Sequence, residues 1–260
     1  MMQRTTSQDW VKTIEGGKGY SAVETGMFRR LLDRMPTYAI FRMLTKYVQK
    51  GQYVLEAGCG YGLSSFALAE SGTDVTAIDI SEKLVKDLNM LKETLGGSIK
   101  EHLTVRVGDI FRLKELMQTF DVVFSDGTYE HFLNADDRKN ILDQTHSVLK
   151  NGGICFIAVP NLKNPFFSSV VDAKMPAMHP FTVKNLAKEM KESGFDVLET
   201  GYSFVNPGFE QWVKSQWMIS VIRVANSVFG FLPRPVQKMM AAHLYCVARS
   251  SRSMSLLREQ

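Results

Sequence analysis

The stretch VLEAGCGYG, residues 54–62, decides the fold of this 260-residue chain. An apolar run ends in Glu56, and glycines follow at alternating positions from Gly58 to Gly62. Residues 63–69 then have a helical pattern, so the local order is strand, glycine turn, helix. Glycine tolerates a positive φ and has no Cβ, so a ligand can approach the backbone of such a turn closely. The turn also opens onto a helix N-terminus, where unpaired N–H groups collect.

A second apolar run, DVTAID at residues 74–79, also ends in an acid. Asp79 lies about twenty residues past Gly58, which is the spacing expected of a carboxylate that binds ribose hydroxyls after the second strand of a dinucleotide-type unit. The structural alternative is that Asp79 or Ser81 caps the following helix. The spacing favours the ribose site.

Apolar runs and helical patterns alternate along most of the chain. This alternation predicts a parallel sheet with helices on both faces. We expect strands at residues 53–57, 74–79, 103–107, 121–124, 154–159, 195–204 and 243–248, and helices at 63–71, 81–96, 135–149 and 181–193.

The glycine spacing separates two interpretations. A nicotinamide-binding domain expects G-x-G-x-x-G, whereas this chain has G-x-G-x-G with Glu56 two residues before the first glycine. That pattern resembles the first motif of class I S-adenosylmethionine-dependent methyltransferases of the small-molecule type. The turn LKNGG at residues 149–153 matches the same family, and the resemblance runs from about residue 50 to 204 and again over 243–248. It implies an α/β fold, a Rossmann-like three-layer sandwich whose mostly parallel seven-stranded sheet has an antiparallel last strand.

The resemblance also implies a cofactor, S-adenosyl-L-methionine, and the residues that hold it. Glu56 and the glycine-turn backbone would hold the methionine part, and Asp79 the ribose. Asp109 would accept a hydrogen bond from the adenine amino group, with Ile80 and Ile110 against the ring. Taken alone, Asp109 is an ordinary turn residue after a strand. The predicted cofactor-binding residues are Tyr20, Glu56, Gly58, Cys59, Gly60, Gly62, Asp79, Ile80, Asp109, Ile110, Ser125 and Asp126.

The segment FDVVFSDGTYEHF, residues 120–132, resembles the fourth-strand motif of small-molecule methyltransferases, which often ends in a Glu-His pair. Ser125 and Asp126 would lie at the carboxyl end of the strand, where the family's backbone meets the cofactor amine. His131 is the candidate catalytic residue, because a neutral imidazole can take a proton from a phenol or an amine. The alternative is that His131 orients the loop or lines the pocket, since methyl transfer needs mainly alignment of the acceptor.

The domain organisation is expected to have two parts. Residues 1–50 form a helical arm and cover, with helices at 20–35 and 37–48, and residues 51–260 form the methyltransferase domain. Within that domain, the Trp- and Met-rich residues 206–242 are too long for a strand connection, and we expect a helical lid-like insertion. Core packing, a dimer interface, and contact with a membrane or a lipophilic acceptor are open alternatives.

Composition excludes several other classes of protein. A net charge of +4 is too small to predict nucleic-acid binding. The three cysteines have neither zinc nor disulfide spacing, so we expect no metal site and a reducing compartment, the cytoplasm. No apolar stretch predicts a spanning helix, although peripheral membrane contact stays open. The expected partner is a small-molecule acceptor, lipophilic ones included, and nothing in the sequence sets the oligomeric state.

The sequence therefore predicts an enzyme that transfers a methyl group from S-adenosylmethionine to an O, N or C atom of a small molecule. The alternatives are a nicotinamide-dependent oxidoreductase and a non-catalytic protein that binds the cofactor or a partner. The glycine spacing and the acid after the third strand argue against the oxidoreductase.

We predict that the protein binds S-adenosylmethionine or S-adenosylhomocysteine and has no comparable affinity for NADH. The reason is the alternating glycines together with the acids Glu56, Asp79 and Asp109. Titration calorimetry with each ligand is the measurement. A preference for NADH would end the methyltransferase interpretation.

Overall fold

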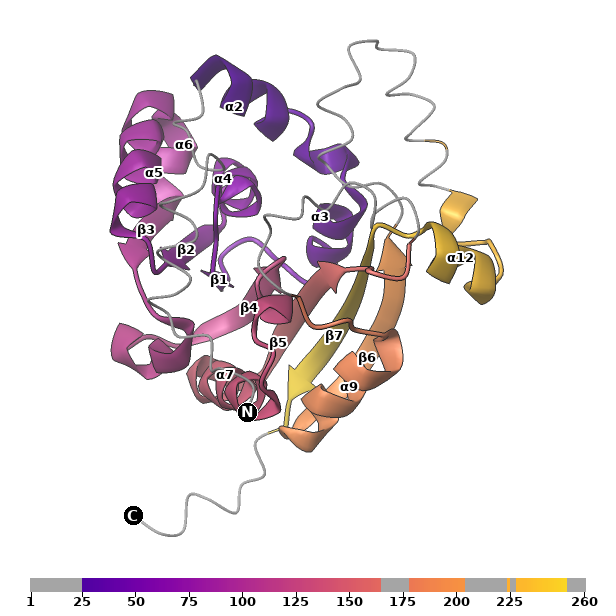
Figure 1. Cartoon of the computed structure of the whole chain (residues 1–260). Coiled ribbons are helices and arrows are strands. Elements are labelled where there is room, and N and C mark those ends of the chain that lie inside the picture. The colour runs from indigo at the N-terminus through magenta and orange to yellow at the C-terminus, as the bar shows by residue number, and fades with distance from the viewer. Residues whose placement is uncertain (1–24, 165–177, 204–223, 225–227, 252–260) are drawn as a thin grey trace, which may run out of the picture.

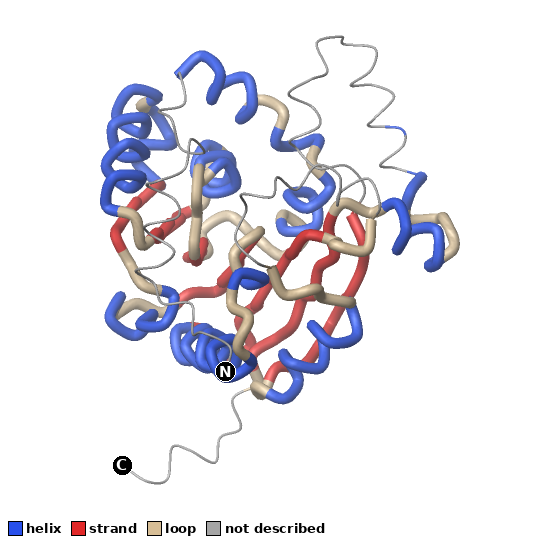
Figure 2. Tube along the Cα trace, viewed as in Figure 1, coloured by secondary structure: helices blue, strands red, loops and turns tan. Residues whose placement is uncertain are grey.

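A seven-stranded β-sheet separates two layers of helices in the computed structural model, which describes residues 25–164, 178–203, 224 and 228–251 (Figures 1 and 2). The strand order is β3-β2-β1-β4-β5-β7-β6. Strands β1 to β5 pair in parallel, and β7 is antiparallel to both of its neighbours, β5 and β6. The strands are β1 Tyr53–Ala57, β2 Asp74–Asp79, β3 Leu103–Val107, β4 Phe120–Asp126, β5 Leu149–Pro160, β6 Phe195–Ser203 and β7 His243–Ser250. This is the fold class predicted from the sequence.

The alternation of side chains along each strand divides the core in two. Val54 packs in a cluster with Phe66 of α4, whereas its neighbour Leu55 packs in a second cluster with Leu142 of α7. The first layer contains α2 Thr25–Leu32, η2 Met35–Thr37, α3 Ala39–Leu44, α4 Leu63–Glu70, α5 Glu82–Leu95 and α6 Gly97–His102. The second contains η3 Ile110–Leu116, η4 Tyr129–His131, α7 Ala135–Val148 and α9 Val183–Glu192. Both faces of the sheet are thus buried, as its long apolar strands require.

Several boundaries differ from those predicted. The turn expected at 149–153 belongs to β5. In the pairing of β4 with β5, Phe120 lies opposite Leu149 and Val122 lies opposite Ile154, so the register shifts between these two pairs. The helix expected to end at Gly96-Gly97 is followed at once by α6, because both glycines adopt positive φ and turn the chain into a second helix. The two N-terminal helices end at Leu32 and Leu44, earlier than predicted, and the second begins at Ala39; residues 20–24 lie outside the described residues.

The N-terminal helices pack on the α4 side of the sheet. Phe28 of α2 meets Phe66 of α4 edge to face, with 4.9 Å between ring centroids. The Tyr47 hydroxyl, just after α3, donates to Glu199 Oε2 on β6 at 2.7 Å, and Tyr245 of β7 donates to the other oxygen at 2.5 Å. Phe28 and Tyr47 thus tie the segment before β1 to α4 and to the edge strand β6. The division into a helical arm and cover at residues 1–50 and a methyltransferase domain at 51–260 remains a prediction.

The predicted insertion, residues 206–242, is described at residues 224 and 228–242. Helix α12, Arg234–Met240, lies beside the end of β6 (Figure 1). The side-chain amide of Asn161 donates to the carbonyl oxygens of Lys238 and Ala241, at 2.8 and 2.9 Å, and that of Asn164 donates to Met240 at 3.2 Å. The lid, dimer-interface, membrane-contact and core alternatives for this segment stay predictions, and Trp212 and Trp217 lie outside the described residues. None of the helices in the described part of the chain has the length and apolarity needed to cross a membrane.

We predict that Phe28→Ala lowers the free energy of unfolding by about 3–5 kcal/mol, because it removes a buried ring and leaves a cavity against Phe66. Met27→Ala is the matched control, since the neighbouring side chain is 39% exposed and a surface change costs about 0.5 kcal/mol or less. Urea denaturation of both variants is the measurement. Equal costs would mean that α2 does not pack on the core in solution.

Candidate functional site

The glycine turn after β1 is built into the ends of two neighbouring strands. Gly58 N and Cys59 N both donate to the carbonyl oxygen of Ile78 at the end of β2, at 3.0 and 2.8 Å. On the β4 side, Thr128 Oγ1 donates to the carbonyl oxygen of Gly58 at 2.9 Å. A Cβ on Gly58 would lie 2.6 Å from the Thr128 methyl group, and the backbone there has φ +75°. Only glycine fits this crossing, for both steric and conformational reasons.

Asp79 ends β2 and braces the same turn. Its Oδ2 accepts from Gly60 N at 3.0 Å, and its Oδ1 accepts from Ser81 N at 3.1 Å. The helix cap is instead Ser81, whose hydroxyl accepts from Leu84 N at the start of α5. Burial raises the pKa of the Asp79 carboxyl, against the backbone hydrogen bonds that it accepts. Asp79 therefore does not cap the helix; its carboxylate accepts backbone hydrogen bonds from the glycine turn and from Ser81, which is compatible with a ribose site.

A pocket opens beside Asp79, where β2, β3 and the segment after β4 end. It brings together predicted residues that are far apart in the sequence. Its lining residues are Gly58, Asp79, Ile80, Gly108, Asp109, Ile110, Phe111, Thr128, His131 and Phe132. Phe111 and Phe132, which the sequence analysis did not select, meet edge to face at 5.1 Å between ring centroids. Phe132 is the last residue of the 120–132 motif, whereas no motif contains Phe111; only the fold shows that both line the pocket.

Asp109 and Ile110 reach the pocket through a tight connection after β3. Gly108 N donates to the carbonyl oxygen of Asp79 at 3.0 Å, which holds the ends of β2 and β3 together. Asp109 begins η3 and accepts from Phe111 N at 2.9 Å. The turn role considered for Asp109 is therefore present, and the carboxylate also lines the pocket. The adenine role remains a prediction.

Glu56 is buried and lies outside the lining of this pocket. Its Oε2 accepts from both Ser65 N, at 3.2 Å, and the Ser65 hydroxyl, in the first turns of α4. Burial raises its pKa to about 8; the Ser65 hydrogen bonds oppose the rise, and the charges of Asp126 and Asp79 add to it. Glu56 is therefore a carboxyl group that is partly protonated at neutral pH and would ionise beside a cation.

Ser125 and Asp126 end β4, next to the glycine turn. Burial raises the pKa of Asp126, and the nearby His243 opposes the rise. The Ser125 hydroxyl is buried and has no hydrogen-bond partner among the described residues. Cys59 is buried within the turn. The cofactor roles of these residues, and of Tyr20, which lies outside the described residues, remain predictions.

His131 lies on η4 and lines the pocket. Burial lowers the pKa of its imidazole to about 4, so the ring is neutral at physiological pH. Its Nε2 lies 3.6 Å from Oε1 of Glu130, a buried carboxyl whose pKa burial raises to about 8. A neutral imidazole can accept a proton, but one with so low a pKa is a weak base. His131 thus lines the pocket, and its role as a general base remains a prediction.

The described part of the chain contains no group of three or more His, Cys, Asp or Glu side chains that could hold a metal ion. Within these residues, the carboxylates at the site are spread over the ends of β1, β2, β3 and β4. What they share is the sheet edge at which open α/β folds bind ligands.

Comparison with known proteins agrees with this geometry. Residues 54–153 match the family model of a methyltransferase domain. A ubiquinone biosynthesis O-methyltransferase of Coxiella burnetii is 29% identical over 131 residues, which cover 48% of this chain and 53% of the relative. Its namesake in Xylella fastidiosa is 30% identical over 147 residues, or 55% of this chain and 57% of the relative. The chain thus spans about half the length of the curated relatives it matches.

Solved structures resemble the fold over more of the chain. A methyltransferase from Archaeoglobus fulgidus superposes with a TM-score of 0.56 at 21% identity, covering 81% of this chain and 91% of that one. The CcbJ methyltransferase from Streptomyces caelestis gives 0.57 at 13% identity, covering 84% and 90%. The fold, the glycine turn and the family match agree with the predicted class I S-adenosylmethionine-dependent methyltransferase domain. The match to the methyltransferase-domain family extends over residues 54–153, and S-adenosylmethionine is the cofactor of this class.

We predict that the cofactor-free protein loses stability as pH rises from 6.5 to 8. The unfolded chain releases the Glu56 proton near pH 4.5, whereas the folded protein keeps it up to about pH 8. Raising the pH between these values therefore favours unfolding, and Glu130 acts in the same direction. The opposing effect of His131 ends near pH 6.5.

Glu56→Gln should remove about 1–2 kcal/mol of this loss, and the exposed Glu101→Gln should leave it unchanged. Urea denaturation at pH 6.5 and pH 8 gives the comparison. An identical pH dependence in wild type and Glu56→Gln would show that Glu56 is ionised throughout.

Proposed function

We propose that this protein transfers a methyl group from S-adenosylmethionine to an O, N or C atom of a small molecule. The observation that carries the proposal is the set of acids at the ends of three adjacent strands around the glycine turn. Glu56 lies near the end of β1, Asp79 ends β2 and Asp109 follows β3, with the last two in one pocket. Support also comes from the methyltransferase-domain match over residues 54–153.

The charges of the site suit a cationic ligand. Glu56 lies close enough to Asp126 and Asp79 for their charges to raise its pKa further. S-adenosylmethionine carries a sulfonium and an ammonium group, and a positive charge close to clustered carboxyl groups favours their ionised form. In this proposal, Glu56 and Asp126 face the methionine part, while Asp79 binds the ribose and Asp109 the adenine. The backbone of the glycine turn lies between these groups.

The cofactor, when bound, supplies an activated methyl group, and the residues of the chain provide its surroundings. The glycine turn offers close backbone approach, and Phe111 and Phe132 supply an apolar wall beside Asp109. Excluding water from this wall strengthens the remaining polar contacts. His131 presents a neutral ring, which can accept a hydrogen bond or a proton without adding a positive charge. Alignment of the acceptor with the methyl carbon contributes most of the rate in such a site.

The relatives suggest which acceptors to test first. Both curated relatives described above are named O-methyltransferases of ubiquinone biosynthesis. We therefore take aromatic hydroxyl compounds, phenols and catechols, as the first acceptor class for this chain, lipophilic ones included. The second candidate function is that of a protein that binds the cofactor but transfers no methyl group. It is considered because the residues that support the proposal concern the cofactor and do not define an acceptor site.

The test is transfer of a labelled methyl group from S-adenosylmethionine to a panel of phenols, catechols and amines. We predict transfer to at least one hydroxyl compound and its loss in Asp79→Ala, which removes charge-assisted hydrogen bonds worth about 1.5–3 kcal/mol each. Asp87→Ala, an acid on the outer face of α5 paired with Lys83, is the control. His131→Ala should lower turnover on the order of 10²–10⁴-fold if the ring is a base, and much less if it only lines the pocket.

The outcomes separate the two candidates. Cofactor binding by calorimetry without transfer to any panel compound would favour the non-catalytic protein. Absence of both would overturn the proposed function.

A further inference from the structure

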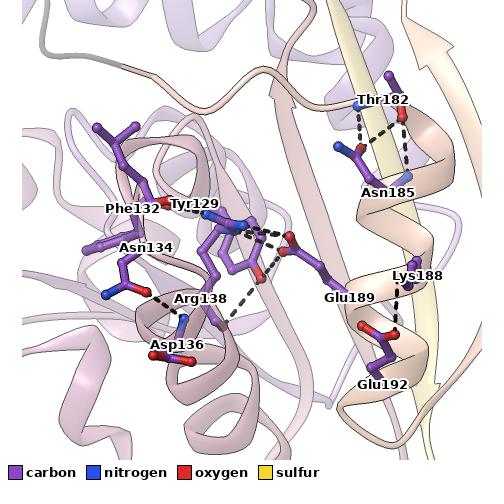
Figure 3. A network of polar contacts seen from close by, with 11 residues as sticks. Tyr129, Phe132, Asn134, Asp136, Arg138, Thr182, Asn185, Lys188, Glu189 and Glu192 are labelled. Carbon is purple, nitrogen blue, oxygen red and sulfur yellow. Dashed lines mark hydrogen bonds and ion pairs between the residues drawn. The ribbon is translucent and has the colours of Figure 1, made fainter. Parts of the chain in front are cut away.

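An ion pair between the buried Arg138 and the partly exposed Glu189 joins α7 to α9 next to the site (Figure 3). Arg138 Nη2 lies 2.8 Å from Glu189 Oε1, and Arg138 Nε donates to both carboxylate oxygens, at 3.2 and 3.0 Å. The arginine is 4% exposed. Burying a charge is costly unless it is paired and its donors are satisfied, so a buried arginine is retained for a definite set of contacts.

The remaining arginine contacts are made to the segment that carries His131. Arg138 Nη1 donates to the carbonyl oxygens of Phe132 and Leu133, at 2.8 and 2.9 Å. The Tyr129 hydroxyl donates to Glu189 Oε2 at 2.9 Å. Arginine and carboxylate therefore hold η4 from both ends, at Tyr129 and at Phe132 (Figure 3).

Aromatic packing encloses this pair. The Tyr129 ring stacks on Phe181 with 5.4 Å between centroids, and the Arg138 guanidinium lies 5.6 Å from the centre of the same Phe181 ring. The aromatic faces exclude water and add a cation–π contact, both of which strengthen the pair. The segment Tyr129–Leu133 is thereby fixed against α7 and α9.

The other side of this segment forms a wall of the cofactor pocket. His131 and Phe132 line the pocket, and so does Thr128, which is bonded to the glycine turn at Gly58. His131 N donates to Thr128 O at 3.1 Å, and His179 N donates to Glu130 O at 2.7 Å. The segment that forms the pocket wall is thus held on one side by the glycine turn and on the other by the Arg138–Glu189 pair.

We propose that Arg138 and Glu189 are positioning residues, which hold His131 and Phe132 at the wall of the cofactor pocket from outside it. A pair that served only to join two helices would need the bidentate contact alone. Arg138 instead uses a separate nitrogen for two backbone oxygens beyond η4, and Glu189 also accepts from Tyr129. Five guanidinium donors in a fixed planar fork make this arrangement specific to arginine. The ligand-binding part of the inference rests on the proposed function.

The experiment compares Arg138→Lys and Tyr129→Phe with Glu192→Gln. Lysine keeps the charge but cannot reach the carboxylate and both carbonyls together, and phenylalanine keeps the stack on Phe181 while losing the bond to Glu189. Glu192 is the control, because its pair with Lys188 on the same helix α9 is exposed and 3.6 Å long. Two readouts are taken: affinity for S-adenosylhomocysteine by calorimetry, and the pKa of His131 by NMR of labelled histidine.

Arg138→Lys is expected to weaken S-adenosylhomocysteine binding on the order of tenfold or more, and Tyr129→Phe by a smaller factor. In both variants the His131 pKa should rise from about 4 toward its ordinary value of 6.5, as the loosened wall admits water. Glu192→Gln should change neither quantity.

A lower melting temperature with unchanged affinity and unchanged His131 pKa in both variants would show that the pair only joins helices, and would overturn the inference. Failure of the wild type to bind S-adenosylhomocysteine would count against the proposed function instead. The His131 pKa would still decide the positioning role in that case. If Arg138→Lys does not fold, Tyr129→Phe decides on both readouts.

Discussion

The site depends on one crossing of the chain, where the backbone of Gly58 passes between the end of β2 and the side chain of Thr128. Two N–H groups of the turn bond to Ile78 on one side, and the threonine hydroxyl bonds to Gly58 on the other. Because no side chain fits at this position, the ends of β1, β2 and β4 are held in a fixed relation. The carboxylates that follow these strands are therefore placed by the backbone, before any ligand is present.

A second constraint is electrostatic. Burial raises the pKa of Glu56, Asp79, Asp126 and Glu130, and lowers that of His131. Each of these groups is thereby shifted toward its neutral form. The site avoids unpaired buried charge in this way and keeps acids that a cationic ligand can ionise. The burial of these acids therefore bears both on the stability of the protein without ligand and on its affinity for a positively charged ligand.

The sequence predicted the sheet well, because local patterns carry that information. The strands β1, β2 and β3 match the predicted boundaries, since each is an apolar run closed by an acid or a glycine. The acids of the site were also identified from their place after these strands. What a strand-by-strand analysis could not show were contacts made across the fold. Phe111 lines the pocket without any motif, and Thr128 and Phe132 line it although the 120–132 motif gave them no role. Arg138 meets Glu189 across fifty-one positions of sequence.

Asn161 and Asn164, which follow β5, link parts of the chain that are far apart in the sequence. Their side-chain amides bind carbonyl oxygens left open at the carboxyl end of α12, and Asn161 N donates to the carbonyl oxygen of Ala242. The turn between α12 and β7 is therefore held by residues about eighty positions earlier in the chain. A substitution at either asparagine would act first on the entry of the chain into β7, the strand that lies between β5 and β6.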